Sequence, residues 1–257
     1  MENILKQMED RFGQLIALIW VFLHKLLPLK MTIEQIQDLI QEKDHPFWIA
    51  FDEAVKLLAP QPIVSAATTD TEDTGDVKKQ VDFWVKFYQE HFGIALDSSE
   101  IKIPLRKVGF NWLVIIALGV SLNQVWEVCQ KHFKCWKYTD LDLESVVQKS
   151  ERGSAKTTSA FWFRDRVEAD EEMKNLSANQ LTEPSITLIA RCLLELKYFS
   201  ETTRKHLDVK NVTLCAGSRY ADGCVPCAGW HRNDSFDIYY SRVGNHYPEL
   251  RSRAAVG

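Results

Sequence analysis

The spacing of apolar residues changes along this chain from a helical period to a period of two, and this change divides the sequence. In residues 3–27, 31–43 and 47–58, apolar side chains recur at helical spacing. The first and the last of these runs end just before a proline, which cannot continue a helix. The pattern therefore predicts a helical segment over residues 1–59.

Residues 60–77 differ in composition from what precedes and follows them. They are rich in Pro, Ser, Thr, Ala and acidic residues and have no apolar period. Such a stretch is typical of a loop or linker. A chain of 257 residues is long enough for one large domain or two small ones. We therefore expect 60–77 to separate the helical segment from an α+β domain over 78–257.

The strongest patterns in the middle of the chain predict two helices and a strand between them. Residues 77–92 carry an apolar, aromatic stripe at helical spacing, and residues 186–199 form the clearest amphipathic pattern in the sequence. Residues 111–118 are a short β-branched run, which predicts a buried strand. Ser121 follows this run and can cap a further helix over 121–133.

Weaker patterns fill the space between these elements. Residues 134–140 and 161–166 are interpreted as strands, residues 141–158 as a polar loop, and the acidic residues 167–175 as a helix.

The last part of the chain, residues 212–257, has a pattern typical of short β-strands separated by turns, and we call it the tail. Its short apolar runs VTLCAGSR, VPCAGWH, FDIYYS and LRSRAAV are separated by turn-forming residues. Asp222-Gly223 and Gly244-Asn245 are turn signals. The predicted fold is therefore α+β: a helical N-terminal part, then a mixed α/β domain that ends in a β-rich region.

Charge and hydropathy exclude some classes of partner. The net charge is −4 with a pI of about 6.0, so no basic field is available for phosphates, and nucleic acid is not the expected partner. The apolar run 15–29 is interrupted by His24 and Lys25 and is too short for a bilayer. We expect a cytoplasmic protein without a membrane span, in which the six cysteines are reduced.

The tail also has its own residue composition. The chain contains nineteen lysines, none of them after Lys210, and the tail has no Gln or Met. Tyr, Ser, Asn, Asp, His, Gly and Arg take their place. Rings with few rotatable bonds, short polar groups and Arg are typical of surfaces built for contact. We predict a binding surface made of Arg219, Tyr220, Trp230, His231, Arg232, Asn233, Asp234, Ser235, Asp237, Tyr239, Tyr240, Arg242, Asn245, His246 and Tyr247.

The tail cysteines offer an alternative. Cys215, Cys224, Cys227 and His231 have the types and the approximate spacing of a tetrahedral zinc site. Against this, Pro226 lies between the paired cysteines, and the flanking runs are strand-like, which turns alternate side chains to opposite faces. We therefore expect buried, unpaired thiols and no metal or cofactor, with zinc as the alternative.

Two further clusters could carry catalysis. Cys129, His132 and Cys135 could supply a nucleophile and a base, and the acidic residues of 168–172 could supply carboxylates or a cation site. The chain has no phosphate-cradling loop, no dinucleotide fingerprint and no nucleophile elbow. The prediction is that the protein is not an enzyme and that these clusters are a core junction and a salt-bridged surface.

Several segments carry a resemblance to known proteins. FRDRVEADEEMKNLSANQL, TLCAGSRYADG, VPCAGW and LRSRAAV resemble a set of uncharacterised bacterial proteins. The tail resembles the variable C-terminal region of target proteins of diversity-generating retroelements, which have a C-type-lectin-like fold. Gly217-Ser218-Arg219 and Leu250-Arg251-Ser252-Arg253 stand at the places of that family's Gly-Ser-Trp-like turn and its final strand.

This resemblance implies a fold and a function. Retroelements of this class mutate adenines, so an altered Asn-type codon yields Tyr, Asn, Asp, Ser, His, Gly, Arg or Cys but never Lys, Gln or Met. The resemblance therefore implies a diversified, non-catalytic surface for a protein or small ligand. Arg219 replaces the usual Trp and no Trp-Asn-Asp calcium motif is present, so calcium-dependent sugar binding is not implied. The alternatives are a zinc-stabilised regulatory or nucleic-acid-associated module, and an enzyme that uses the two clusters above.

Overall fold

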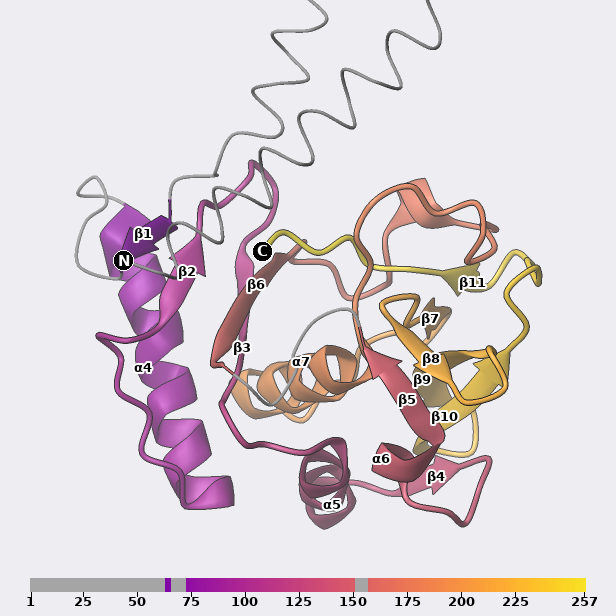
Figure 1. The fold of residues 1–257 in the computed structure, drawn as a ribbon, viewed down its shortest axis with the longest axis horizontal. Helices are drawn as coiled ribbons and strands as arrows, with labels where there is room; N and C mark the ends of the chain where they lie inside the picture. Colours follow the sequence, from indigo (N-terminus) through magenta and orange to yellow (C-terminus); the bar gives the residue numbers. More distant parts are fainter. Residues whose placement is uncertain (1–62, 66–72, 151–156) are drawn as a thin grey trace, which may run out of the picture. The chain divides into compact units, whose positions relative to one another are not determined.

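The computed structural model describes residues 63–65, 73–150 and 157–257 (Figure 1). The chain divides into two compact units, Met1–Pro60 and Gln61–Gly257, and all the elements below belong to the second unit. The helices predicted over 1–59 lie outside the described residues.

Helix α4 (Asp73–Phe92) packs through its aromatic stripe on strand β3 (Trp112–Ile116). Val81, Trp84 and Tyr88 are buried, as their spacing predicts. The Trp84 indole and the Tyr88 hydroxyl donate hydrogen bonds of 2.8 Å and 2.7 Å to backbone carbonyls of β3. The stripe is therefore core, and its polar atoms fix the helix to the strand.

The segment 60–77 is not one continuous loop. Ile63–Ser65 form strand β1, which pairs antiparallel with β2 (Lys102–Pro104), and α4 already begins at Asp73. A short strand of this kind is stabilised by backbone pairing with a distant segment, so local composition does not reveal it.

Helix α7 (Leu188–Glu201) lies at the centre of the unit (Figure 1). It contacts α5 (Leu122–His132), β3 and a tail strand. Its ten residues Leu188–Lys197 are all buried, so it is enclosed rather than amphipathic. Strand β3 pairs antiparallel with β6 (Ser159–Phe163), and both strands are found where the sequence predicts them. α5 begins at the predicted cap, Ser121, in a full capping box.

The tail supplies four of the five strands of the largest sheet, in the order β11-β7-β9-β10-β4. β9 and β10 form an antiparallel hairpin, β7 pairs antiparallel with β9, and β4 and β11 join the two edges in parallel. The strands are β4 (Cys135–Lys137), β7 (Val212–Leu214), β9 (Val225–His231), β10 (Ser235–Ser241) and β11 (Leu250–Arg251). Each predicted run of the tail thus contains a strand, but VTLCAGSR is divided between β7 and β8 (Ser218–Tyr220), and only the first two residues of LRSRAAV are strand.

Both faces of this sheet are covered over part of their area. Phe236 and Ile238 of β10 belong to the main core, beneath α5 and α7. On the opposite face, Leu214, Cys227 and Leu250 belong to a second, smaller apolar cluster. This double coverage explains why β9 and the first half of β10 are buried at successive positions instead of at alternate ones.

Two predictions for the middle of the chain are wrong. The loop expected over 141–158 contains helix α6 (Leu143–Val146) and strand β5 (Val147–Ser150), and β5 pairs with β8 (Ser218–Tyr220) of the tail. The acidic helix expected over 167–175 is reduced to a 3₁₀ turn, Glu171–Met173. In both places the backbone bonds to the tail, for example from the Asp170 amide to the Ser252 carbonyl, and these contacts override local propensity.

The described part of the chain is therefore α+β, as the patterns predict, with one mixed five-stranded sheet and three antiparallel two-stranded sheets. None of its helices has the length and apolar character to span a bilayer.

Candidate functional site

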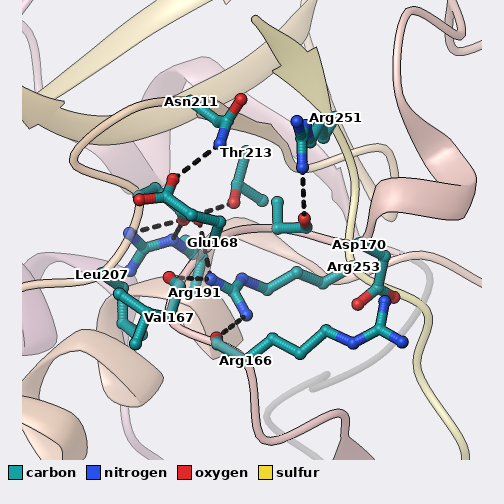
Figure 2. A network of polar contacts seen from close by, with 12 residues as sticks. Arg166, Val167, Glu168, Asp170, Arg191, Leu207, Asn211, Thr213, Arg251 and Arg253 are labelled. Atoms are coloured by element: carbon teal, nitrogen blue, oxygen red, sulfur yellow. Dashed lines mark hydrogen bonds and ion pairs between the residues drawn. The ribbon is translucent and has the colours of Figure 1, made fainter.

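The tail is anchored in the core by a buried ionic network around Asp208 (Figure 2). The Asp208 carboxylate is inaccessible to solvent and accepts hydrogen bonds from Arg253 Nη2 at 2.7 Å, Arg191 Nε at 2.9 Å and Thr213 Oγ1 at 2.5 Å. These groups come from α7, β7 and the end of the tail. The network therefore connects the first and the last tail strands to the central helix.

The charges of the network balance one another. Arg191 also donates to Glu195 Oε2 at 2.7 Å, so two guanidinium groups face two carboxylates. Burial raises the pKa of Asp208, but the charges of Arg253 and Arg191 outweigh it, and the pKa lies below its ordinary value. Asp208 also has a φ of 53°, a backbone conformation that its ion pairs hold in place.

The acidic segment 168–172 serves as a second anchor. The Glu168 carboxylate accepts from Asn211 Nδ2 at 2.7 Å (Figure 2). Asp170 Oδ2 accepts from Arg164 Nη1 at 2.6 Å and from the Ala254 amide at 2.8 Å. Glu171 and Glu172 pair with Arg251 and Arg166. These carboxylates thus hold the tail and the arginines beside it.

One face of the sheet carries a polar and aromatic cluster where β10 meets β4. Asp237 is buried, and its two oxygens accept from Ser235 Oγ and from the Tyr239 hydroxyl, both at 2.6 Å. The Tyr239 ring lies 5.1 Å from that of Trp136, measured between centroids. Partial burial and the bond to Asp237 raise the pKa of Tyr239, so its hydroxyl stays protonated and held. The cluster presents rings in a fixed geometry.

The tip of the β9–β10 hairpin is the first exposed part of the tail surface. Arg232, Asn233 and Asp234 connect the strands, with Asp234 in the left-handed conformation at φ 62°. The Asn233 side-chain oxygen lies 2.8 Å from His231 Nδ1 and 2.7 Å from Ser235 Oγ. The turn is therefore shaped by its own side chains.

A stack of rings connects this tip to the buried network. Trp230 donates from its indole to Asp234 Oδ1 at 3.3 Å, and its ring stacks on His206 with centroids 3.3 Å apart. His206 Nδ1 in turn lies 3.0 Å from Glu195 Oε1. The position of the tip is thus determined by contacts that reach α7.

The other end of β10 is the second exposed part. Tyr240 is 55% exposed and rests against Tyr138, and the predicted turn at Gly244-Asn245 is present, with the Asn245 amide bonded to the Arg242 carbonyl at 2.9 Å. Tyr247 is partly covered, and this burial raises its pKa to about 12.

The predicted surface residues fall into three groups by exposure. Nine are exposed to solvent: His231, Arg232, Asn233, Asp234, Tyr240, Arg242, Asn245, His246 and Tyr247. Arg219, Trp230 and Tyr239 are half-buried, and the Arg219 guanidinium is occupied by carbonyls of its own turn. Tyr220, Ser235 and Asp237 are buried, so they support the surface from below instead of contacting a ligand.

The tail surface has one prominent neighbour that sequence reasoning missed. Trp136, on β4, is 46% exposed and lies beside Tyr239. It is about a hundred positions away along the chain, and only the parallel pairing of β4 with β10 brings it here. A Trp between two nearby lysines is a sequence pattern that can indicate a contact residue. The sequence around Trp136 does not show that it lies beside the tail.

The four possible zinc ligands do not converge. Cys227 and His231 lie four residues apart on the extended strand β9, about 13 Å at the rise of a strand, whereas zinc bonds are only about 2 Å long. Cys215 is buried, and Cys224 lies in the turn before β9. Among the described residues, no three His, Cys, Asp or Glu side chains gather as metal ligands.

The cluster of Cys129, His132 and Cys135 lies at the junction of α5 and β4. Burial strongly raises the pKa of Cys129, and a hydrogen bond with the thiol of Cys192 raises it further. Burial also raises the pKa of Cys135. Both thiols are therefore held in the protonated form, which is a poor nucleophile. The His132 ring packs edge-on against His91, with centroids 5.0 Å apart. The arrangement is that of a packed junction.

No protein-family model, no curated protein and no solved structure matches this chain.

Proposed function

We propose that the exposed side chains of the tail, together with Trp136, form a non-catalytic contact surface for a protein or small ligand. The observation that carries this proposal is the contrast within one hairpin. The hairpin tip, the end of β10 and the loop after it present nine polar and aromatic side chains to water, while the middle of the hairpin is fixed by buried hydrogen bonds. Rigid rings and Arg on a fixed backbone lose little conformational entropy on binding.

The proposal includes the identity of the tail as a diversified, C-type-lectin-like region. Its exposed residues support this: apart from Ala221, Pro248 and Glu249, each is a Tyr, Asn, Asp, His, Gly or Arg, the types that adenine mutation of an Asn-type codon yields. The buried residues Leu214, Asp237 and Arg253 belong to the framework, where free variation would unfold the protein.

A triple variant tests the contact surface. Replacing Tyr240, Arg242 and Asn245 by alanine removes three exposed side chains from one end of β10. We expect the free energy of unfolding to change by no more than about 0.5 kcal/mol per site. We also expect the variant to lose the partner that the wild-type protein captures, compared by cross-linking and quantitative mass spectrometry.

The matched control is the triple alanine variant at Asp82, Lys86 and Gln89, which are exposed on α4. It should retain the partner. A large loss of stability in the tail variant would show that its side chains belong to the core, and an unchanged set of partners would contradict the proposed surface.

The diversification has its own test, which is the DNA around the gene. A neighbouring reverse transcriptase, with a near-copy of the tail's coding sequence that differs at adenines, is the expected finding. Flanking DNA without either one would refute diversification but leave the contact surface standing.

A further inference from the structure

Strand β4 forms one outer edge of the five-stranded sheet. The Phe236 amide of β10 donates to the Lys134 carbonyl, and the Tyr138 amide donates to the Ile238 carbonyl. These two bonds show that every second residue of 134–138 directs its backbone groups towards β10. The backbone groups of Trp136 therefore face β10, whereas the N–H and C=O groups of Cys135 and Lys137 point away from it. Among the described residues, these outward groups have no backbone partner.

The side chains along this edge give it a distinct chemistry. Residues 131–138, KHFKCWKY, contain three lysines and no acidic residue. Lys134 and Trp136 are exposed on one side of the strand, and the neighbouring hairpin tip exposes Arg232 and Asp234, whose charges offset one another, so the positive charge of the edge comes from its lysines. Lys134 reaches this tip, since its amine donates to the Asn233 carbonyl at 3.5 Å. The edge is thus basic and carries an accessible indole.

We propose that the β4 edge binds an extended, acidic segment of a partner protein by strand addition. The segment donates and accepts backbone hydrogen bonds at Cys135 and Lys137, lays an apolar side chain beside Trp136, and meets the lysines with carboxylates. Lysines on an edge strand oppose pairing with a second copy of the same edge, because they would bring like charges together. The same lysines attract an acidic strand, which is why the charge favours a partner of opposite sign.

This inference goes beyond the proposed function. The hydrogen bonds come from the backbone of β4, which lies outside residues 212–257, so they do not depend on which side chains the tail carries. A partner held at this edge would extend the sheet beside Trp136, which contacts Tyr239, and beside Lys134, which contacts the hairpin tip.

Synthetic peptides test the edge on the full-length protein. The probe is a short peptide that repeats Val-Val-Glu-Glu, capped at both ends, so that each face of the strand carries valine and glutamate in turn, and its counterpart has lysine in place of each glutamate. We expect the glutamate peptide to bind and the lysine peptide to bind at least about tenfold more weakly, measured by calorimetry at low salt. Hydrogen exchange should show slower exchange of the Cys135 and Lys137 amides when the glutamate peptide is bound.

Two matched changes separate strand addition from simple charge attraction. Lys137→Pro removes an outward N–H, whereas Lys137→Ala removes only the side chain, including its bond to the Leu141 carbonyl. We expect Lys137→Pro to bind the glutamate peptide about tenfold more weakly than Lys137→Ala does. A glutamate peptide that is N-methylated at every residue keeps its charge and should lose binding to the wild-type protein, which tests the same bonds without altering the fold.

The outcomes are distinct. Failure of the wild-type protein to bind the glutamate peptide, equal binding by the two Lys137 variants, or full binding of the N-methylated peptide would overturn the inference. The tail variant at Tyr240, Arg242 and Asn245 should bind the glutamate peptide normally, so failure of the edge and failure of the tail surface give different results.

Discussion

Two arginines of the tail show how burial separates framework from surface at the scale of single residues. Arg253 is 1% exposed and bonds to Asp208 and to the carbonyls of Arg166 and Val167, whereas Arg242 is exposed. Arg253→Met leaves a buried carboxylate with one partner fewer, so we expect it to lose about 3–5 kcal/mol of stability.

Urea unfolding measures this loss, and Arg242→Met is the matched control. That control should change the free energy of unfolding by less than about 0.5 kcal/mol. Equal effects of the two variants would mean that the ionic network does not hold the tail.

Asp208 gives the network a definite pH dependence. Its pKa in the folded protein lies below the ordinary value of 3.8, so the carboxylate stabilises the fold fully above pH 3.8. That contribution should disappear as the pH falls below 3.8 through the folded-state pKa. We expect the melting temperature of the wild-type protein to fall in this range, and that of Asp208→Asn, lower throughout, to fall less steeply. Parallel curves for the two proteins would exclude Asp208 as a source of this dependence.

At the scale of elements, two glycines of the tail differ in the space that surrounds them. A Cβ on Gly217 would lie 2.6 Å from the Ser185 carbonyl oxygen and 2.9 Å from Thr187 Cγ2, at the start of α7. A Cβ on Gly244 would meet nothing within 4 Å. We expect Gly217→Ala to lose about 1–3 kcal/mol by overpacking, and Gly244→Ala to be nearly neutral.

Chemical denaturation of the two alanine variants checks this expectation. If Gly217→Ala were as stable as Gly244→Ala, the close approach of the tail to α7 would not be a constraint on the fold.

The elements also show where local patterns suffice. α4, β3, α5 and the runs that form β9 and β10 were predicted because each has a strong period, a cap or flanking turn residues in its own sequence, whereas β6 was predicted two to three residues too late from a weaker pattern. β1, β5 and the 3₁₀ turn at Glu171–Met173 were missed because pairing with distant backbone decides them. The burial of α7 on all sides was also missed, since a helix pattern shows one apolar face but not how many layers surround it.

At the scale of the whole molecule, the reactivity of the six cysteines measures how accessible the core is to solvent. Cys129, Cys192, Cys215 and Cys227 are buried, and Cys135 is half-buried with a raised pKa. Cys224 lies in a turn with partial exposure, and slight burial and the neighbouring Asp222 raise its pKa above 9.0. We expect Cys224 to react first with a thiol reagent under native conditions, and faster as the pH rises towards its pKa.

Counting reactive thiols with Ellman's reagent tests this order. Cys224→Ser should remove the fast phase, Cys135→Ser should leave it unchanged, and denaturant should expose all six thiols. Fast reaction of several thiols in the native state would mean that the two apolar layers around the tail sheet are open.

The sequence by itself determined the helices and strands that carry a period, a cap or a turn signal, because these signals are local, and it determined that the tail differs in composition. The tertiary structure alone decided which tail residues meet water. Tyr220, Ser235 and Asp237 are buried although they resemble their exposed neighbours in type, because strand pairing and hydrogen bonds within the tail turn them inward. Only the tertiary structure placed Trp136 beside them, since parallel pairing joins segments that share no local signal.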